Sequence, residues 1–322
     1  MVGKINKVLT VTVVSIFLYA VWAFYSGFDQ VYAGLQRVGW VGFGVLLALS
    51  LFNYGLRFFR WHLMIGQVTG VWVPIRAHLS CYLSGFALTA TPGKIGEALR
   101  SYYLRPHGVA VKDSLAALFA ERLIDLISVL FIGALALTRF SEYRWIGIFV
   151  VLIVLFAAGC VRSPYLVIFL RWLHAKVNNQ KLHYTLSHLI DMMESAARYM
   201  VWRVWLIGLV LGVLAWGAEA WGLMLLVTWL TGEDATLIVA GIYALSMIVG
   251  AISFLPGGLG GAEAVMAGLL VALGVSFSDA TVATIICRVV TLWFAIFIGL
   301  AVMMRYQYIA AQKLKFSSED IL

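Results

Sequence analysis

Two apolar stretches of this chain are interrupted at a Pro-Gly pair, and these interruptions constrain the fold more than any other feature. Residues 77–91 lead into Pro92-Gly93, and residues 262–275 follow Pro256-Gly257. A helix needs roughly 20 apolar residues to cross a bilayer, so both segments are too short to span comfortably. Proline also removes a helical hydrogen bond. We therefore expect two re-entrant helical hairpins that turn near mid-membrane, where non-helical backbone is tolerated only inside protein or beside a water-filled cavity.

The two Pro-Gly segments belong to a longer stretch that occurs twice. Glu97 and Arg122 in the first copy match Glu263 and Arg288 in the second, and both matches are 166 residues apart. Further matches are Gly108-Val109 with Gly274-Val275, Asp113 with Asp279, Gly133 with Gly299, and, more weakly, Tyr54-Gly55-Leu56-Arg57 with Trp216-Gly217-Ala218-Glu219. This pattern predicts an internal repeat, with repeat 1 at about 39–138 and repeat 2 at about 204–305.

The composition is that of a membrane protein. Hydrophobic residues make up 63% of the chain and charged residues only 12%, against about 25% charged residues in a soluble domain. The net charge of +8 comes from Lys and Arg scattered between apolar segments, which favours a topological role and excludes a nucleic-acid-binding domain. Cys81, Cys160 and Cys287 form no paired motif, so we expect buried, inert thiols. We expect neither a metal site nor a cofactor.

Basic residues set the expected topology. Residues 1–322 are predicted to form a single all-α polytopic transmembrane domain with about six spanning helices and the two hairpins. The predicted spans are about 8–26, 39–57, 115–138, 145–161, 204–230 and 280–304. Arg57, Arg60 and Arg76 are interpreted as the cytoplasmic flank of the second span. Both termini are then cytoplasmic, and the two repeats are inverted relative to each other, an architecture typical of secondary transporters.

Residues 163–203 hold the densest basic loop and are predicted to be cytoplasmic. Apolar residues recur there at helical spacing, at Leu182, Leu186, Leu189, Ile190, Met193, Ala197 and Met200. The spacing predicts an amphipathic linker helix that lies on the membrane.

Several charged residues are expected inside the membrane. With the third span beginning near residue 115, Arg122 lies roughly 10 Å deep and Asp125 near 15 Å at ~1.5 Å per residue. A charge at that depth costs at least ~2.5–3.5 kcal/mol and marks a functional candidate. The candidates are Arg57, Glu97, Arg100, Glu121, Arg122, Asp125, Glu219, Glu263 and Arg288, with hairpin tips at Pro92, Gly93, Gly96, Pro256, Gly257 and Gly260.

Two interpretations of these charges stay open. Glu97 with Arg122 and Glu263 with Arg288 could be ion pairs that only hold each hairpin to its neighbouring helix. Alternatively, each Pro-Gly turn places the N-terminus of a half-helix at mid-membrane, where its N–H groups attract an anion such as a phosphate. Together with Arg122 and Arg288 they would form a site for an anionic headgroup.

The sequence resembles the flippase-like domain family, also called the lysylphosphatidylglycerol synthase transmembrane region. The resemblance is carried by Pro92-Gly93-x-x-Gly96-Glu97-x-x-Arg100, Glu121-Arg122-x-x-Asp125, Leu255-Pro256-Gly257-Gly258-Leu259-Gly260-x-x-Glu263 and Arg288. It implies movement of lipids, such as aminoacylated phospholipids or polyprenyl-linked sugars, across the cytoplasmic membrane. No synthase domain follows in this sequence, so we expect a standalone member.

The resulting hypothesis is a lipid translocase, not an enzyme, that moves an anionic, phosphate-bearing lipid across the cytoplasmic membrane. One alternative is an integral membrane enzyme of lipid-linked sugar metabolism, with Glu97 or Glu263 as acid-base groups. Another is a non-transporting scaffold for a lipid synthase. The expected partners are the membrane lipid and either a second copy of the chain or a lipid-synthesis enzyme.

Overall fold

The computed structural model describes residues 28–89, 91, 97–139, 163–177, 179–199 and 201–305, with isolated positions between 140 and 162. All regular structure in these residues is helical. The predicted span at 8–26 and the hairpin tip residues Pro92, Gly93 and Gly96 lie outside the described residues. Most of the predicted span at 145–161 does too.

The second predicted span is much longer than expected. Helix α2 runs from Phe28 to Thr69 with a kink at Gly39, whose φ of 65° lies in the left-handed region that glycine adopts without penalty. Since the helix continues twelve residues beyond the predicted end at Arg57, Arg57 and Arg60 lie within it, and both are buried. Their interpretation as a cytoplasmic flank is therefore wrong.

Two short helices and one long helix follow. These are α3 (Ile75–Phe86), α4 (Leu99–Leu104) with a 3-10 turn at Arg105–His107, and α5 (Val111–Gly133) with a 3-10 turn at Ala136–Thr138. The 3-10 turn after α4 ends at Gly108, which has a φ of 85° and leads the chain back towards α5. α3 and α4 thus lie on either side of the first Pro-Gly pair, as the sequence pattern predicts.

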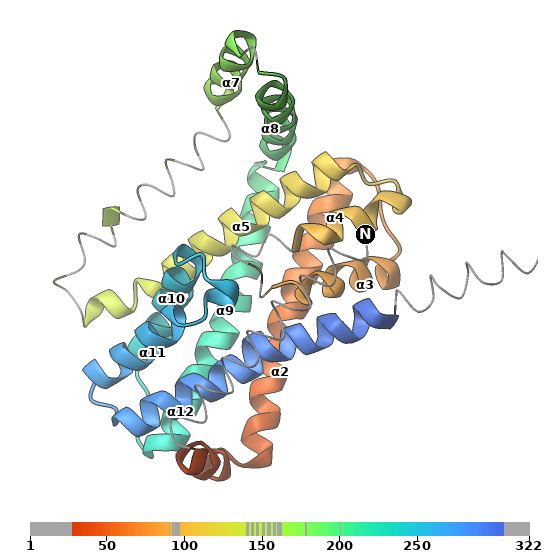
Figure 1. The fold of residues 1–322 in the computed structure, drawn as a ribbon. Coiled ribbons are helices and arrows are strands. Elements are labelled where there is room, and N and C mark those ends of the chain that lie inside the picture. The colour runs from red at the N-terminus through yellow and green to blue at the C-terminus, as the bar shows by residue number, and fades with distance from the viewer. Residues whose placement is uncertain are drawn as a thin grey trace, which may run out of the picture.

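Helices α7 (Pro164–Lys176) and α8 (Gln180–Tyr199) form a pair that projects from one end of the helix bundle (Figure 1). Three residues of the predicted stripe, Leu186, Ile190 and Met193, are buried with Leu170 of α7 in one apolar cluster. Since this face of α8 packs inside the protein, the expectation that it lies on the membrane is wrong.

The C-terminal part contains a second broken pair. Its elements are α9 (Trp202–Thr231), α10 (Leu237–Ile252), a 3-10 turn at Pro256–Gly258, α11 (Gly261–Ala272) and α12 (Phe277–Arg288), which continues through a π-helical segment, Val289–Trp293, to Arg305. α10 packs against α11 across the Pro-Gly turn. Gly250 makes this close approach possible, because an added Cβ would lie 2.9 Å from Cβ of Ala262.

The long helices form the centre of the molecule. α2 packs along α9, and α9 also packs against α5 (Figure 1). Within the described residues, Asp29–Thr69, Trp202–Thr231 and Phe277–Arg305 are long and apolar enough to cross a membrane. α5 lies among them but carries Glu121, Arg122 and Asp125 in its middle. The charges of α5 therefore need partners from its neighbours.

Candidate functional site

A cluster of seven charged residues surrounds the middle of α5. We call it the arginine cluster: Arg57 and Arg60 of α2, Glu97 just before α4, Arg100 of α4, and Glu121, Arg122 and Asp125 of α5. Its members come from helices on both sides of the first Pro-Gly pair. All of them except Arg122 are buried.

The two carboxylates of α5 each bind an arginine closely. Asp125 Oδ1 lies 2.5 Å from Nη2 of Arg60 and also accepts a hydrogen bond of 3.1 Å from the indole N–H of Trp216. Glu121 accepts a hydrogen bond from Arg100, whose guanidinium stacks over the Trp61 ring with 3.7 Å to its centroid. The two arginines hold α2 and α4 against α5.

Arg122 is held less completely. Its Nη2 lies 3.3 Å from Glu97, 3.5 Å from Glu121 and 3.5 Å from Asp125. None of these carboxylates has hydrogen-bonding geometry toward it, and among the described residues its buried Nε and Nη2 groups have no hydrogen-bond acceptor. The Arg122 side chain is 28% exposed. Arg122 therefore keeps donors available for a further acceptor.

The cluster also carries more positive than negative charge. Four arginines face three carboxylates when all are ionised, which leaves one positive charge in excess. Arg57 is buried, and its Nη2 lies 3.9 Å from Glu121 and 3.6 Å from Asp125. Within the part of the chain that the structure describes, the Nε and Nη2 groups of Arg57 have no hydrogen-bond acceptor. A buried donor without a partner costs about 1–3 kcal/mol, and more when charged, so this arrangement favours an anionic guest.

A second, smaller ion pair lies at the other Pro-Gly turn. Arg288 Nε donates to Glu263 Oε1 at 2.7 Å, and its Nη2 donates to the carbonyl oxygen of Gly257 at 2.6 Å. Glu263 also accepts a hydrogen bond of 2.7 Å from the backbone N–H of Gly260, the N-cap of α11. This pair fixes the second turn to α12.

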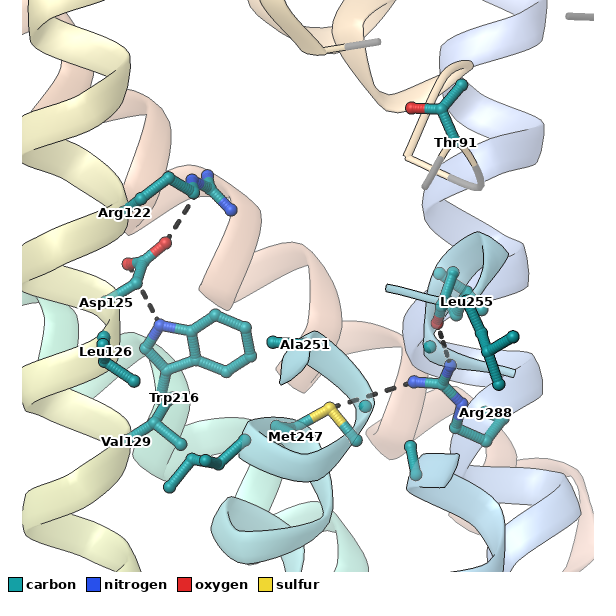
Figure 2. Close-up of a pocket in the computed structure, with 16 residues that line it drawn as sticks. Thr91, Arg122, Asp125, Leu126, Val129, Trp216, Met247, Ala251, Leu255 and Arg288 are labelled. Atoms are coloured by element: carbon teal, nitrogen blue, oxygen red, sulfur yellow. Dashed lines mark hydrogen bonds and ion pairs between the residues drawn. The ribbon is translucent and has the colours of Figure 1, made fainter. Parts of the chain in front are cut away.

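A cavity of about 180 Å³ lies between Arg122 and Arg288. Figure 2 shows Arg122, Asp125 and Trp216 on one side and Arg288 on the other, with Met247 between them. Thr91, directly before the first Pro-Gly pair, lines the same cavity as Gly257 of the second. Thr91 and the second Pro-Gly turn thus line one cavity, whereas the predicted approach of Pro92-Gly93 to that turn lies outside the described residues.

A smaller cavity of about 50 Å³ adjoins the first and shares Trp216, Met247, Arg288 and Leu292 with it. It is lined by Arg57, Glu97 and Glu219. Glu219 of α9 accepts a hydrogen bond from the Tyr243 hydroxyl. The Trp216 indole separates the cavities, and Arg57 stacks over it with 5.2 Å to the ring centroid.

The structure brings together almost all of the described candidates from the sequence. Arg57, Glu97, Arg100, Arg122 and Asp125 belong to the arginine cluster, Glu263 and Arg288 form the second pair, and Glu219 lines the smaller cavity. Gly257 lines the larger cavity, while Pro256 and Gly260 flank it at the start of the turn and of α11.

Three residues of the site are missed by the sequence argument. Arg60 and Trp216 bind Asp125, and Tyr243 binds Glu219. Arg57 and Arg60 are three positions apart, the spacing that puts side chains on one helical face. That spacing was the available signal that α2 continues and presents both arginines to one partner.

Comparisons with known proteins are consistent with this geometry. The profile of the family described as lysylphosphatidylglycerol synthase TM region matches residues 8–299. Two relatives from Methanothermobacter thermautotrophicus are each named UPF0104 membrane protein. One is 24% identical over 241 residues, covering 68% of this chain and 71% of the relative. The other is 24% identical over 306 residues, covering 88% of this chain and 89% of the relative.

Proposed function

Because this chain belongs to the lysylphosphatidylglycerol synthase TM region family, we propose that it is a translocase for an anionic, phosphate-bearing lipid. The substrate class includes phospholipids and polyprenyl-phosphate-linked sugars. The protein acts in the cytoplasmic membrane with both termini on the cytoplasmic side, and it catalyses no covalent step. The lipid headgroup passes through the cavity between Arg122 and Arg288, while its acyl or prenyl chains stay in the bilayer.

One observation carries this proposal. The arginine cluster has an excess positive charge beside a cavity, and the Nε and Nη2 groups of Arg57 and Arg122 have no hydrogen-bond acceptor in the described ranges. A guanidinium presents paired N–H donors that match the oxygens of a phosphate. In a membrane interior such donors are costly unless they are used by a ligand. Arg288 already donates to Glu263, Gly257 and the sulfur of Met247, so Arg122 and Arg57 are the headgroup ligands in this proposal.

An inverted repeat is the second part of the proposal, and backbone conformation supports it. Gly108 and Gly274, which are 166 residues apart, both have left-handed φ values, 85° and 104°. The helices α2 and α9 end before Gly70 and Gly232, which also have left-handed φ values, 74° and 77°. The sequence match of Tyr54 with Trp216 has the same 162-residue separation as these two glycines.

Ion pairs support the same correspondence. Glu97 with Arg122 repeats as Glu263 with Arg288. Asp113 at the start of α5 binds Arg198, and its counterpart Asp279 at the start of α12 binds Arg37. In an inverted repeat α3 with α4, and α10 with α11, are re-entrant hairpins from opposite faces, and the substrate lies between the repeats. The cavity lined by Thr91 and Gly257 has this position.

The test is reconstitution of the purified protein in liposomes, followed by an assay that resolves the two leaflets. The expected result is net transbilayer movement of an anionic phospholipid, and impaired movement for Arg122→Lys. Arg37→Lys is the matched control, because Arg37 pairs with Asp279 away from the cavity. Covalent conversion of a lipid-linked sugar would instead indicate a membrane enzyme. The absence of both activities would favour a scaffold for a lipid synthase.

A further inference from the structure

A second basic recess lies on the surface, apart from the two central cavities. It is formed where the end of α2 meets the start of α9, at the junction with α8. Its lining residues are Gln67, Val68, Arg198, Val201, Trp202, Arg203, Val204, Leu206 and Ile207. α2 and α9 lie side by side along much of their length, and the recess lies at one end of this contact.

The two arginines of this recess differ in their contacts. Arg198 donates to Asp113 and to the hydroxyl of Ser195, so its charge holds α8 against α5. Arg203 is exposed, and among the described residues no carboxylate lies within ion-pair distance of it. In the proposed repeat Trp202 matches Trp40, so the counterpart of Arg203 in the other repeat is Val41. The positive charge of Arg203 therefore has no equivalent at the matching position.

Below Arg203 the wall of the recess is apolar. Val201, Trp202, Leu206 and Ile207 are all exposed large hydrophobic residues. A tryptophan beside a basic residue at the end of a spanning helix is the arrangement found at headgroup level in membranes. The recess thus offers a positive charge to a headgroup and an apolar surface to the chains attached to it.

The recess and the arginine cluster lie on different faces of α9. Gly208 and Gly212 lie on the face of α9 that contacts Arg60, and an added Cβ at Gly212 would be 3.0 Å from Nη1 of Arg60. These glycines are five and nine residues beyond Arg203, which corresponds to about 140° and 180° around the helix axis at ~3.6 residues per turn. Arg203 therefore faces away from the buried cluster, on the side of the exposed Leu206 and Ile207.

We propose that the Arg203 recess binds anionic phospholipid from the cytoplasmic leaflet. The leaflet rests on the topology of the proposed function, whereas binding at Arg203 is a separate property. The ligand class is a phosphodiester headgroup with a net negative charge and attached acyl chains. Free phosphate has the same charged group but lacks the chains that would contact Trp202 and Leu206.

The experiment counts lipids bound to the purified protein by native mass spectrometry, with phosphatidylglycerol and phosphatidylcholine as probes. Arg203→Gln is expected to weaken phosphatidylglycerol binding about fivefold, the effect of one basic charge at a membrane surface. Arg203→Lys is expected to keep most of the binding. Arg171→Gln is the matched control, because Arg171 is exposed on α7 and pairs with Glu194 outside the recess. High salt should reproduce the loss, since exposed charges are screened.

Some outcomes overturn the proposal. Unchanged phosphatidylglycerol binding in Arg203→Gln would do so, as would equal binding of phosphatidylcholine. Competition by inorganic phosphate as effective as that by the lipid would show a simple anion site and refute a lipid site. The two proposals fail separately. Arg203-dependent binding without any transport by the wild type would contradict the translocase alone, whereas transport by a wild type whose phosphatidylglycerol binding is insensitive to Arg203→Gln would contradict the lipid site at Arg203 alone.

Discussion

Replacing Glu97 and Arg122 together distinguishes two roles of Arg122. Arg122 either binds the lipid headgroup or only holds the chain before α4 against α5. Arg122→Met alone leaves three arginines facing three carboxylates and removes the partner 3.3 Å from buried Glu97. Loss of one partner of a buried pair costs about 3–5 kcal/mol. The double variant Glu97→Gln, Arg122→Met removes one charge of each sign, so the cluster keeps its excess positive charge. We expect its free energy of unfolding to lie within about 1 kcal/mol of the wild-type value.

Lipid transport by the double variant, unlike its stability, should fall. If Arg122 binds the headgroup, the double variant folds but loses its bidentate contact. Arg122→Lys keeps the charge and loses one of two charge-assisted hydrogen bonds, each ~1.5–3 kcal/mol. At ~1.36 kcal/mol per factor of ten, its transport should fall about tenfold to a hundredfold.

The assay compares leaflet-resolved lipid movement at matched amounts of folded protein, with unfolding followed in mixed micelles of detergent and SDS. Arg37→Lys controls for the loss of an arginine elsewhere. A double variant that is as stable as the wild type and equally active would refute the reasoning, because Arg122 would then be only a clamp between α5 and the first hairpin.

Three further predictions concern the hairpins and the topology. Glu263→Ala removes the partner of Arg288 and the side-chain acceptor at the start of α11. The free energy of unfolding, followed by thermal unfolding in detergent, should therefore fall by about 3–5 kcal/mol. An unchanged unfolding midpoint would show that this ion pair does not stabilise the second turn. Gly258→Ala should also destabilise the protein, by about 1–3 kcal/mol, because its φ is 71° and an added Cβ would lie 3.0 Å from backbone atoms of Gly250; the same unfolding assay applies. Cysteine accessibility scanning should find α7 and α8 open to the cytoplasmic side and residues 276–278 to the outside, and labelling of both from one side would remove the inverted repeat.

The sequence predicts local structure well where a residue type has one structural effect. Pro256-Gly257 ends an apolar helix whatever surrounds it, and the turn, α10 and α11 lie where that pattern predicts. The equal spacing of Glu97 from Arg122 and of Glu263 from Arg288 also predicts two ion pairs, and both are present.

The errors have a common cause. An arginine near the end of an apolar run has the same local sequence whether it contacts water or a buried carboxylate. The sequence argument assigns Arg57 and Arg60 to water at the end of a span. Their actual partners, Glu121 and Asp125, lie more than sixty residues away in the chain. The stripe on α8 is ambiguous for the same reason, because Leu186 and Ile190 serve equally well against lipid or against Leu170. Pairing partners at long range are set by the fold and not by the local pattern.

Helix α12 contacts Gly257 of the second Pro-Gly pair and also Ala87, which precedes the first pair. Arg288 binds the carbonyl oxygen of Gly257, while an added Cβ at Gly299 would lie 2.1 Å from the backbone nitrogen of Ala87. The two contacts are about 16.5 Å apart along the helix at ~1.5 Å per residue, and the π-helical segment Val289–Trp293 lies between them. If α12 tilts as one rod, the two turns must move together. Independent opening would require the helix to bend, and π-helical segments are among the few places where helices bend sharply.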